Sequence, residues 1–182
     1  MGRVRIIGGI HRSRVIQFKD LHGCIRPTPD RVRETLFNWL GQDLTSKICL
    51  DLFTGSGGLA FEAVSRNAQK VVCVEHDSNV VCDLRKNQQL LRAENLDIIH
   101  GSALNYLQQT PAKFDVIFLD PPYSSDLLMQ SLHLITRYSV LANHGIIYVE
   151  YQKSPDLADY LVLKQGRAGA VNYALIIPKV KE

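Results

Sequence analysis

The chain has 182 residues, of which 46% are apolar and 21% charged, and its formal net charge is +3. These values are typical of one ordinary globular domain with a sizeable core. No apolar run approaches the roughly 20 residues of a membrane span, and the first residues do not form a signal peptide, so we expect a cytoplasmic protein.

Positive charge is concentrated near the N-terminus. The first 40 residues carry eight Lys and Arg against three acids, a net +5, which leaves −2 for the rest of the chain. This bias favours contact between that segment and a polyanion such as nucleic acid, with a solvated surface as the alternative.

The four cysteines, Cys24, Cys49, Cys73 and Cys82, include no CxxC pair. We expect them to be small buried hydrophobic side chains rather than parts of a disulfide or a zinc site. No cluster of Cys and His offers ligands for another metal, so the sequence predicts no metal.

Residues 1–41 are predicted to form a basic extension made of a hairpin and a helix. Residues 4–7 and 14–18 are strand candidates, and the Gly8-Gly9 pair between them can turn. The helix spans residues 28–41, with Thr28 as the N-cap, Pro29 in the first turn and Gly41 at the end. Its apolar face is Val32, Leu36, Phe37 and Leu40, and Arg31 and Arg33 are expected to point elsewhere.

Residues 42–182 alternate between strand and helix patterns. The strand candidates are 48–53, 70–75, 97–100, 114–120 and 146–150, and the helix candidates are 59–66, 79–92 and 126–138. Several strands are apolar throughout, which indicates a parallel sheet buried on both faces and therefore a doubly wound α/β fold. Residues 160–163 and 173–177 are strand candidates joined by a turn with Gly166 and Gly169, and they predict a final antiparallel hairpin.

A glycine-rich turn follows the first strand of this sheet, in the sequence DLFTGSGGL at residues 51–59. Glycines between a strand and a helix let a ligand approach the backbone and the helix N-terminus. Glu75 ends the next strand, where nucleotide-binding sheets of this kind hold a ribose diol. The pattern predicts a cofactor that contains a nucleoside, and by itself it leaves NAD and S-adenosylmethionine open.

A second motif, DPPY at residues 120–123, ends an apolar strand. Alone, it could be a strand end closed by prolines and a core tyrosine. On the same sheet as the glycine-rich turn, it is better explained as a site, because ligands of such sheets bind at the carboxyl ends of the strands.

The sequence resembles the RsmD family of S-adenosylmethionine-dependent methyltransferases over nearly its whole length. The segments that carry this resemblance are RIIGGIHRSR, RPTPDRVRETLFNWL, DLFTGSGGLAFEA, DPPY and YVE. The resemblance implies a Rossmann-like seven-stranded sheet of class I and methylation of the exocyclic N2 of one guanine in 16S rRNA. It further implies that the partner is the 30S ribosomal subunit or its assembly intermediate, and we expect a monomer.

The resemblance also implies the site residues. The cofactor set is Asp51, Phe53, Gly55, Ser56, Gly57, Glu75, His76, Ser102, Ala103 and Asp120, with Asp77 as an additional candidate. Glu75 would bind the ribose hydroxyls, and Ser102-Ala103 would lie beside the adenine. Arg12, Arg14, Arg26 and Arg31 are the candidates for contact with RNA phosphates.

The chemistry explains the residue types in DPPY. An exocyclic amine attacks a sulfonium methyl group only when the lone pair of the nitrogen is aligned with that methyl group. The Asp120 carboxylate and the Pro121 carbonyl can provide this alignment by accepting hydrogen bonds from the two N–H groups of the amine. Pro121 and Pro122 hold that carbonyl by fixing φ, and Tyr123 can stack on the base. Adenine offers a similar amine, so a DNA adenine-N6 methyltransferase is an alternative. A non-catalytic RNA-docking module and a nicotinamide dehydrogenase are more distant ones.

Overall fold

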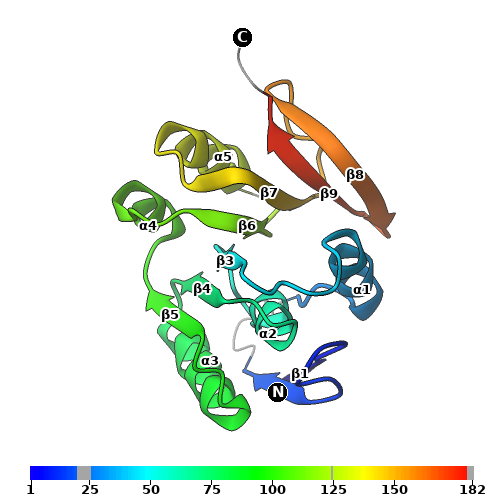
Figure 1. The fold of residues 1–182 in the computed structure, drawn as a ribbon, viewed down its shortest axis with the longest axis vertical. Helices are drawn as coiled ribbons and strands as arrows, with labels where there is room; N and C mark the ends of the chain where they lie inside the picture. The colour runs from blue at the N-terminus through cyan, green and yellow to red at the C-terminus, as the bar shows by residue number, and fades with distance from the viewer. Residues whose placement is uncertain (20–25, 124, 180–182) are drawn as a thin grey trace.

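The computed structural model describes residues 1–19, 26–123 and 125–179 (Figure 1). The first half of the chain forms β1 (Gly2–Arg5), β2 (Val15–Phe18), α1 (Asp30–Trp39), β3 (Ile48–Asp51), α2 (Gly58–Ser65), β4 (Lys70–Glu75) and α3 (Ser78–Leu91). The second half forms β5 (Leu96–His100), α4 (Ala103–Gln109), β6 (Phe114–Leu119), α5 (Leu127–Arg137), β7 (Leu141–Tyr151), β8 (Tyr160–Ala168) and β9 (Val171–Pro178).

Seven of these strands form the main sheet, in the order β5-β4-β3-β6-β7-β9-β8, and β1 pairs with β2 in a separate antiparallel hairpin. The five strands from β5 to β7 are parallel, whereas β9 runs antiparallel to both β7 and β8. The predicted doubly wound sheet, its final antiparallel hairpin and the N-terminal hairpin with its helix are therefore confirmed.

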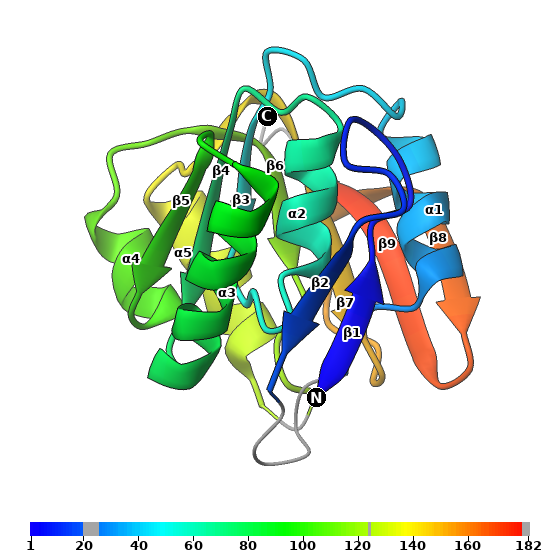
Figure 2. The same ribbon diagram turned by 90° about the horizontal axis from the view of Figure 1, so that it is seen from below.

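Helices cover both faces of the sheet. The N-terminal hairpin, α1, α2 and α3 lie on one face, and α4 and α5 lie on the other (Figures 1 and 2). In β6, Val116 and Phe118 pack into the first layer, while Ile117 packs into the second. Alternate side chains of one strand thus enter two different cores, which is why the strand is apolar throughout.

The N-terminal extension is joined to the sheet through the fully buried carboxylate of Glu62 in α2. This group accepts hydrogen bonds from Ile7 N at 2.8 Å and Gly8 N at 2.9 Å, and it pairs with Arg33 Nη1 at 3.2 Å and Arg66 Nε at 2.9 Å. The expectation that Arg33 points away from the apolar face of its helix is wrong, because its guanidinium is buried against this carboxylate. The division of the chain at residue 41 stays a prediction.

Several local predictions differ from the structure. Pro29, and not Thr28, occupies the N-cap of α1, because the Thr28 hydroxyl bonds the distant Glu150 instead. The seven-residue α4 was not predicted, since so short an apolar pattern carries little helical periodicity. Gly166 lies inside β8 and not in a turn, because the Tyr173 ring packs over it: a Cβ there would lie 2.5 Å from Tyr173 Cζ.

The cysteine prediction is confirmed in part. Cys49 and Cys73 are buried, Cys82 is exposed on α3, and Cys24 lies outside the described residues. Within the described ranges, no helix is both long and apolar enough to cross a membrane. The same residues contain no group of three or more His, Cys, Asp and Glu side chains that could hold a metal ion.

Candidate active site

Four carboxylates lie at the carboxyl ends of four neighbouring strands: Glu75 in β4, Asp51 in β3, Asp120 just after β6 and Glu150 in β7. Asp51 is in register with Cys73 and Phe118, and Phe118 is in register with Tyr148. Each of the other three acids stands two residues beyond one of these partners. Because side chains alternate along a strand, all four acids belong to the face covered by α1 and α2.

The glycine-rich turn lies between β3 and α2 in a conformation that favours glycine. Gly55 and Gly57 have φ values of +50° and +82°, and a Cβ on Gly57 would lie 2.7 Å from Leu84 Cδ2. The turn is fixed by Asp51, whose buried carboxylate accepts backbone hydrogen bonds from Ala60 and Phe53. A side chain at Gly57 would therefore clash with the core, and Gly55 is the partly exposed glycine of the turn.

Burial dominates the electrostatics of Asp51. It raises the pKa of this carboxyl to about 7, against the lowering effect of the Ala60 backbone hydrogen bond, and the charge of Glu75 raises it further. A cationic group placed beside Asp51 would relieve this desolvation by favouring the charged form.

Glu75 is fixed by backbone donors from two loops. Its Oε2 accepts from Gly55 N at 2.9 Å, and its Oε1 accepts from His76 N at 2.8 Å and Asp77 N at 2.9 Å. A carboxylate oxygen has two lone pairs, so Oε2 can accept a further donor such as a ribose hydroxyl. Beside the partly exposed Gly55, this free acceptor position fits the ribose of a nucleoside-containing cofactor.

The DPPY motif meets Glu150 and Thr28 at the end of β6. The Thr28 hydroxyl lies 3.0 Å from Glu150 Oε1 and 3.5 Å from Asp120 Oδ2, so it bridges the two carboxyl groups. Tyr148 donates to Glu150 Oε1 at 2.8 Å, and the Tyr123 hydroxyl lies 3.4 Å from Glu150 Oε2. Two acids and three hydroxyls thus form a single, largely buried polar cluster.

The two carboxyl groups of this cluster disfavour ionisation. Burial raises the pKa of Asp120 well above its ordinary value, and the neighbouring charges of Glu150 and Asp51 add to the effect. Burial also raises the pKa of Glu150, although hydrogen bonds from Tyr148, Thr28 and Tyr123 act in the opposite direction. Hydrogen-bond donors supplied by a ligand would stabilise both charges.

Most of the predicted cofactor and catalytic residues lie at this one edge of the sheet. Ser102 is the exposed N-cap of α4, after the strand next to β4, and Ala103 is the first residue of that helix. Phe53 is half-buried, Ser56 is buried, and the His76 side chain is 86% exposed at the rim. Pro121 is buried and Pro122 is exposed, so the first proline packs against the protein and the second faces solvent.

The four predicted RNA-binding arginines are all exposed, but they lie at two different ends of the molecule. Arg26 precedes Thr28 and therefore lies near the acids, and Arg31 follows in the first turn of α1. Arg12 and Arg14 lie in the hairpin turn, where Arg14 Nη2 reaches Leu90 O at 3.4 Å near the end of α3. Figure 2 shows this turn beside the C-terminal end of α2, at the opposite edge of the sheet.

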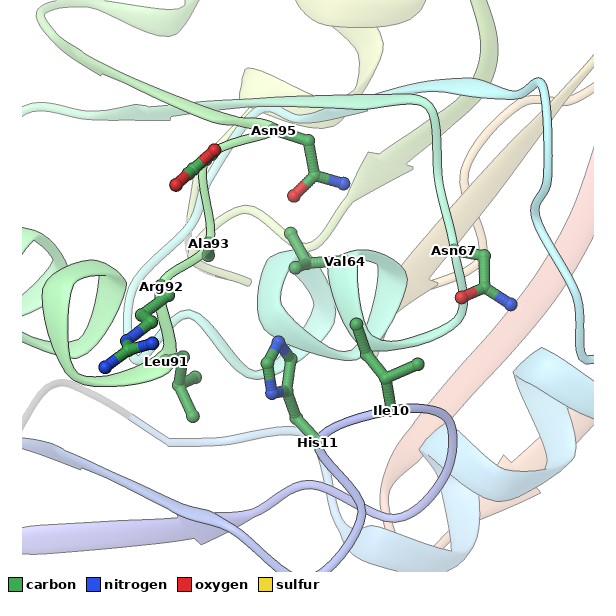
Figure 3. Close-up of a pocket in the computed structure, with 9 residues that line it drawn as sticks. Ile10, His11, Val64, Asn67, Leu91, Arg92, Ala93 and Asn95 are labelled. Carbon is green, nitrogen blue, oxygen red and sulfur yellow. The ribbon is translucent and has the colours of Figure 1, made fainter.

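A surface hollow of about 600 Å³ lies at that opposite edge (Figure 3). It lies between the hairpin turn, the end of α2 and the loop after α3, and its lining includes Ile10, His11, Val64, Arg92 and Asn95. Ligands of doubly wound sheets bind at the carboxyl ends of the strands. This hollow is at the amino ends, so we assign it no role in the chemistry.

The sequence predictions omit Glu150 from the site and do not predict the hydroxyl contacts of Thr28. Glu150 was quoted as part of YVE but received no role, although it ends a strand that the topology places beside DPPY. The sequence predicts Thr28 as a helix N-cap, and the family resemblance implies that residues 26–28 are a candidate lid over the site, which stays a prediction. The signal that could have found Glu150 is the adjacency of the strand ends, which becomes visible only once the strand order is known.

Comparisons with known proteins agree with this arrangement. Residues 4–177 match the protein family described as "Conserved hypothetical protein 95". The chain is 42% identical over 181 residues to "Ribosomal RNA small subunit methyltransferase D" of Haemophilus influenzae, covering 96% of this chain and 93% of that protein. It is 39% identical to the protein of the same name from Escherichia coli K12, covering 96% and 89%. The solved structure of yhhF from Escherichia coli superposes with a TM-score of 0.89 at 37% identity, covering 99% of this chain and all of that one.

Proposed function

The chain belongs to the family described as Conserved hypothetical protein 95, and we propose that it transfers a methyl group from S-adenosylmethionine to the exocyclic N2 of a guanine in 16S rRNA. The observation that carries this proposal is the position of Asp120, which lies between the glycine-rich turn and Glu150 at one edge of the sheet. The relatives of this chain that are named ribosomal RNA small subunit methyltransferase D support the reaction class and the substrate.

The chain offers a defined set of residues for the cofactor. Glu75 Oε2 would accept a ribose hydroxyl, the backbone at Gly55 and Gly57 would lie along the methionine part, and Asp51 would face that part from β3. Ser102 and Ala103 would border the adenine. Bound S-adenosylmethionine supplies an electrophilic methyl group.

The role of DPPY is to hold and activate the guanine amine. Asp120 and the Pro121 carbonyl each accept a hydrogen bond from one N–H group of this amine. These two hydrogen bonds turn the lone pair of the nitrogen toward the methyl donor. As the nitrogen gains positive charge, the carboxylate binds it more strongly than it bound the neutral amine, so the transition state is stabilised selectively. The proton released at the end can pass to Asp120, whose pKa is raised by burial.

The partner in this proposal is the 30S ribosomal subunit or its assembly intermediate, and a monomer in the cytoplasm is sufficient for the reaction. The exposed Arg26 and Arg31 lie on the same side as the acids and would contact phosphates near the target base. Arg12 and Arg14 would contact RNA further away, around the other edge of the sheet. Tyr123 would stack on the guanine once it has left its own stack.

The deciding experiment uses 30S particles from a strain that lacks the gene. Incubation with the purified protein and labelled S-adenosylmethionine, followed by mapping of the modified base, should give N2-methylguanine at one position of 16S rRNA. Transfer to naked DNA adenine with none to 30S particles would establish the DNA adenine-N6 alternative. Cofactor binding without transfer to either substrate would establish a non-catalytic docking module.

A further inference from the structure

The acceptor oxygens of Glu150 are unequally satisfied. Oε1 accepts hydrogen bonds from Thr28 at 3.0 Å and Tyr148 at 2.8 Å, whereas Oε2 has only the Tyr123 hydroxyl at 3.4 Å. Hydroxyl-to-oxygen hydrogen bonds are typically about 2.7–2.8 Å long, so the Tyr123 contact is weak. Glu150 is only 2% exposed. A buried carboxylate oxygen without a strong donor is costly, and a ligand that brings one is favoured.

The unsatisfied oxygen belongs to the same cluster as the amine-binding carboxylate. Asp120 and Glu150 each stand two residues beyond a register pair, Phe118 with Tyr148, and the Thr28 hydroxyl touches both groups. Neighbouring strands lie about 4.8 Å apart, so the two carboxyl groups can contact adjacent atoms on one edge of a base. The Tyr123 hydroxyl contacts Oε2 at 3.4 Å, and so long a hydrogen bond is weak enough to be replaced by a better donor.

Guanine and adenine differ at the ring atom next to the exocyclic amine. In guanine the N2 amine is flanked by the N1–H donor, while in adenine the N6 amine is flanked by ring nitrogens that only accept. A carboxylate oxygen beside the amine therefore pairs with guanine and repels adenine. A site with a buried polar group discriminates strongly against a base that offers this group no hydrogen-bond partner.

We propose that Glu150 Oε2 accepts the N1–H of the target guanine while Asp120 holds the adjacent N2 amine, which makes Glu150 the residue that selects guanine over adenine. This inference rests on the proposed function and adds a determinant of base specificity to it. DPPY alone can present either amine to a methyl donor. Thr28 and Tyr148 act as positioning residues, because they fix Oε1 and so direct Oε2 toward the base.

The geometry makes Glu150→Gln an informative change. Thr28 and Tyr148 are donors, so they should retain the amide oxygen at the place of Oε1 and leave the amide NH2 at the place of Oε2. The substitution keeps the shape of the side chain and converts the acceptor that faces the base into a donor. It should disfavour guanine and favour a base that has an acceptor at position 1.

The matching base is 2-aminopurine, which keeps the 2-amino group and carries an acceptor at N1. We would measure kcat/KM on 30S particles reconstituted with 16S rRNA carrying guanine or 2-aminopurine at the mapped target position. The wild-type protein should prefer guanine by about 10- to 100-fold, the range expected for one hydrogen bond to a charged group. In E150Q this preference should disappear or reverse, and comparing all four combinations isolates the coupling between residue and base.

An equal preference for guanine in the wild-type protein and in E150Q would overturn the inference. So would a wild-type protein that transfers equally well to 2-aminopurine, because a protonated Glu150 would then be the donor. Absence of transfer to guanine by the wild-type protein would instead refute the proposed function. The exposed Glu94→Gln at the other edge of the sheet is the matched control and should retain the wild-type preference.

Thermal unfolding and affinity for S-adenosylmethionine establish whether E150Q is folded. If it is not, Glu150→Asp provides the second test, because it keeps the charge and withdraws the acceptor from the base. Its preference for guanine should fall below that of the wild-type protein, and an undiminished preference would count against the inference.

Discussion

Arg33 Nη1 lies 3.2 Å from Glu62 Oε2, and both side chains are fully buried. Arg33 belongs to α1 of the N-terminal extension and Glu62 to α2, which packs on the main sheet. The same carboxylate also holds the backbone of Ile7 and Gly8 in the hairpin. One buried acid thus connects all parts of the extension to the sheet.

Replacing Glu62 by Ala should destabilise the protein by about 3–5 kcal/mol, because it removes the buried carboxylate that pairs with both Arg33 and Arg66 and leaves Arg33 only the exposed Asp30 carboxylate at 2.7 Å. Urea-induced unfolding at neutral pH would measure the loss. Asp97→Ala is the control, since Asp97 pairs with Lys70 at 2.7 Å while both side chains are about half exposed. An exposed pair of this kind contributes about 0–1 kcal/mol. A loss below 1 kcal/mol for Glu62→Ala would show that the network is dispensable.

The main sheet could be predicted because its signals are local. A few consecutive residues are enough to recognise the mainly apolar strand at residues 114–120 and the glycine-rich turn at 55–57. The alternation of strands and helices then indicates the fold class. Arg33 could not be placed in the same way. A charged residue in a helix is predicted to be solvent-exposed unless its buried partner is known. The partner of Arg33 is Glu62, which is 29 positions away in the sequence.

The candidate site shows the same limit. Glu75 and Asp120 were found because each follows a motif, whereas Glu150 has no motif of its own and gains meaning only from the pairing of β6 with β7. The prediction of Thr28 as the N-cap is wrong for a similar reason. Its hydroxyl is used by residues 92 and 122 positions away, which no local pattern contains.

Asp120→Asn should abolish most methyl transfer and leave cofactor binding nearly unchanged. The substitution removes the negative charge that stabilises the developing cation, a kind of electrostatic loss that lowers kcat by about 10²- to 10³-fold. Single-turnover methylation of 30S particles would measure the rate, and calorimetry would measure cofactor affinity. Turnover within tenfold of the wild-type rate would contradict the assigned role of Asp120.

Glu75→Ala should weaken the binding of S-adenosylmethionine by about 10- to 100-fold, the equivalent of one or two hydrogen bonds to a charged group. The loss has two sources, because Glu75 would accept a ribose hydroxyl and also holds Gly55 N at 2.9 Å. Calorimetric titration with the cofactor measures the effect, and Asp97→Ala serves again as the control. Unchanged affinity in a folded Glu75→Ala protein would place the ribose elsewhere.

Arg26→Ala should weaken binding to 30S particles and lower the dependence of that binding on salt by about one ion per contact. Filter binding at several salt concentrations provides the slope. Arg12→Ala tests the opposite edge of the sheet separately, because its exposed side chain lies in the hairpin turn. A reduced slope for Arg26→Ala with an unchanged slope for Arg12→Ala would restrict the RNA contact to the side of the acids.

The last prediction concerns pH and Asp51. Burial raises the pKa of this carboxyl to about 7 in the folded protein, above its ordinary value of 3.8. Between these two values the Asp51 carboxyl binds more protons in the folded state than in the unfolded state, so its contribution to the free energy of unfolding decreases as pH rises from about 4 to about 7. Asp51→Asn removes this contribution, and the difference in unfolding free energy between the two proteins should therefore change across that interval and level off above it.

Urea unfolding of both proteins at a series of pH values measures the difference. The charge of Asp51 also raises the pKa of Asp120, so the difference between the two proteins reports Asp51 together with its coupling to Asp120. A constant difference from pH 4 to pH 8 would mean that Asp51 is ionised throughout, and that the Ala60 and Phe53 backbone donors outweigh its burial.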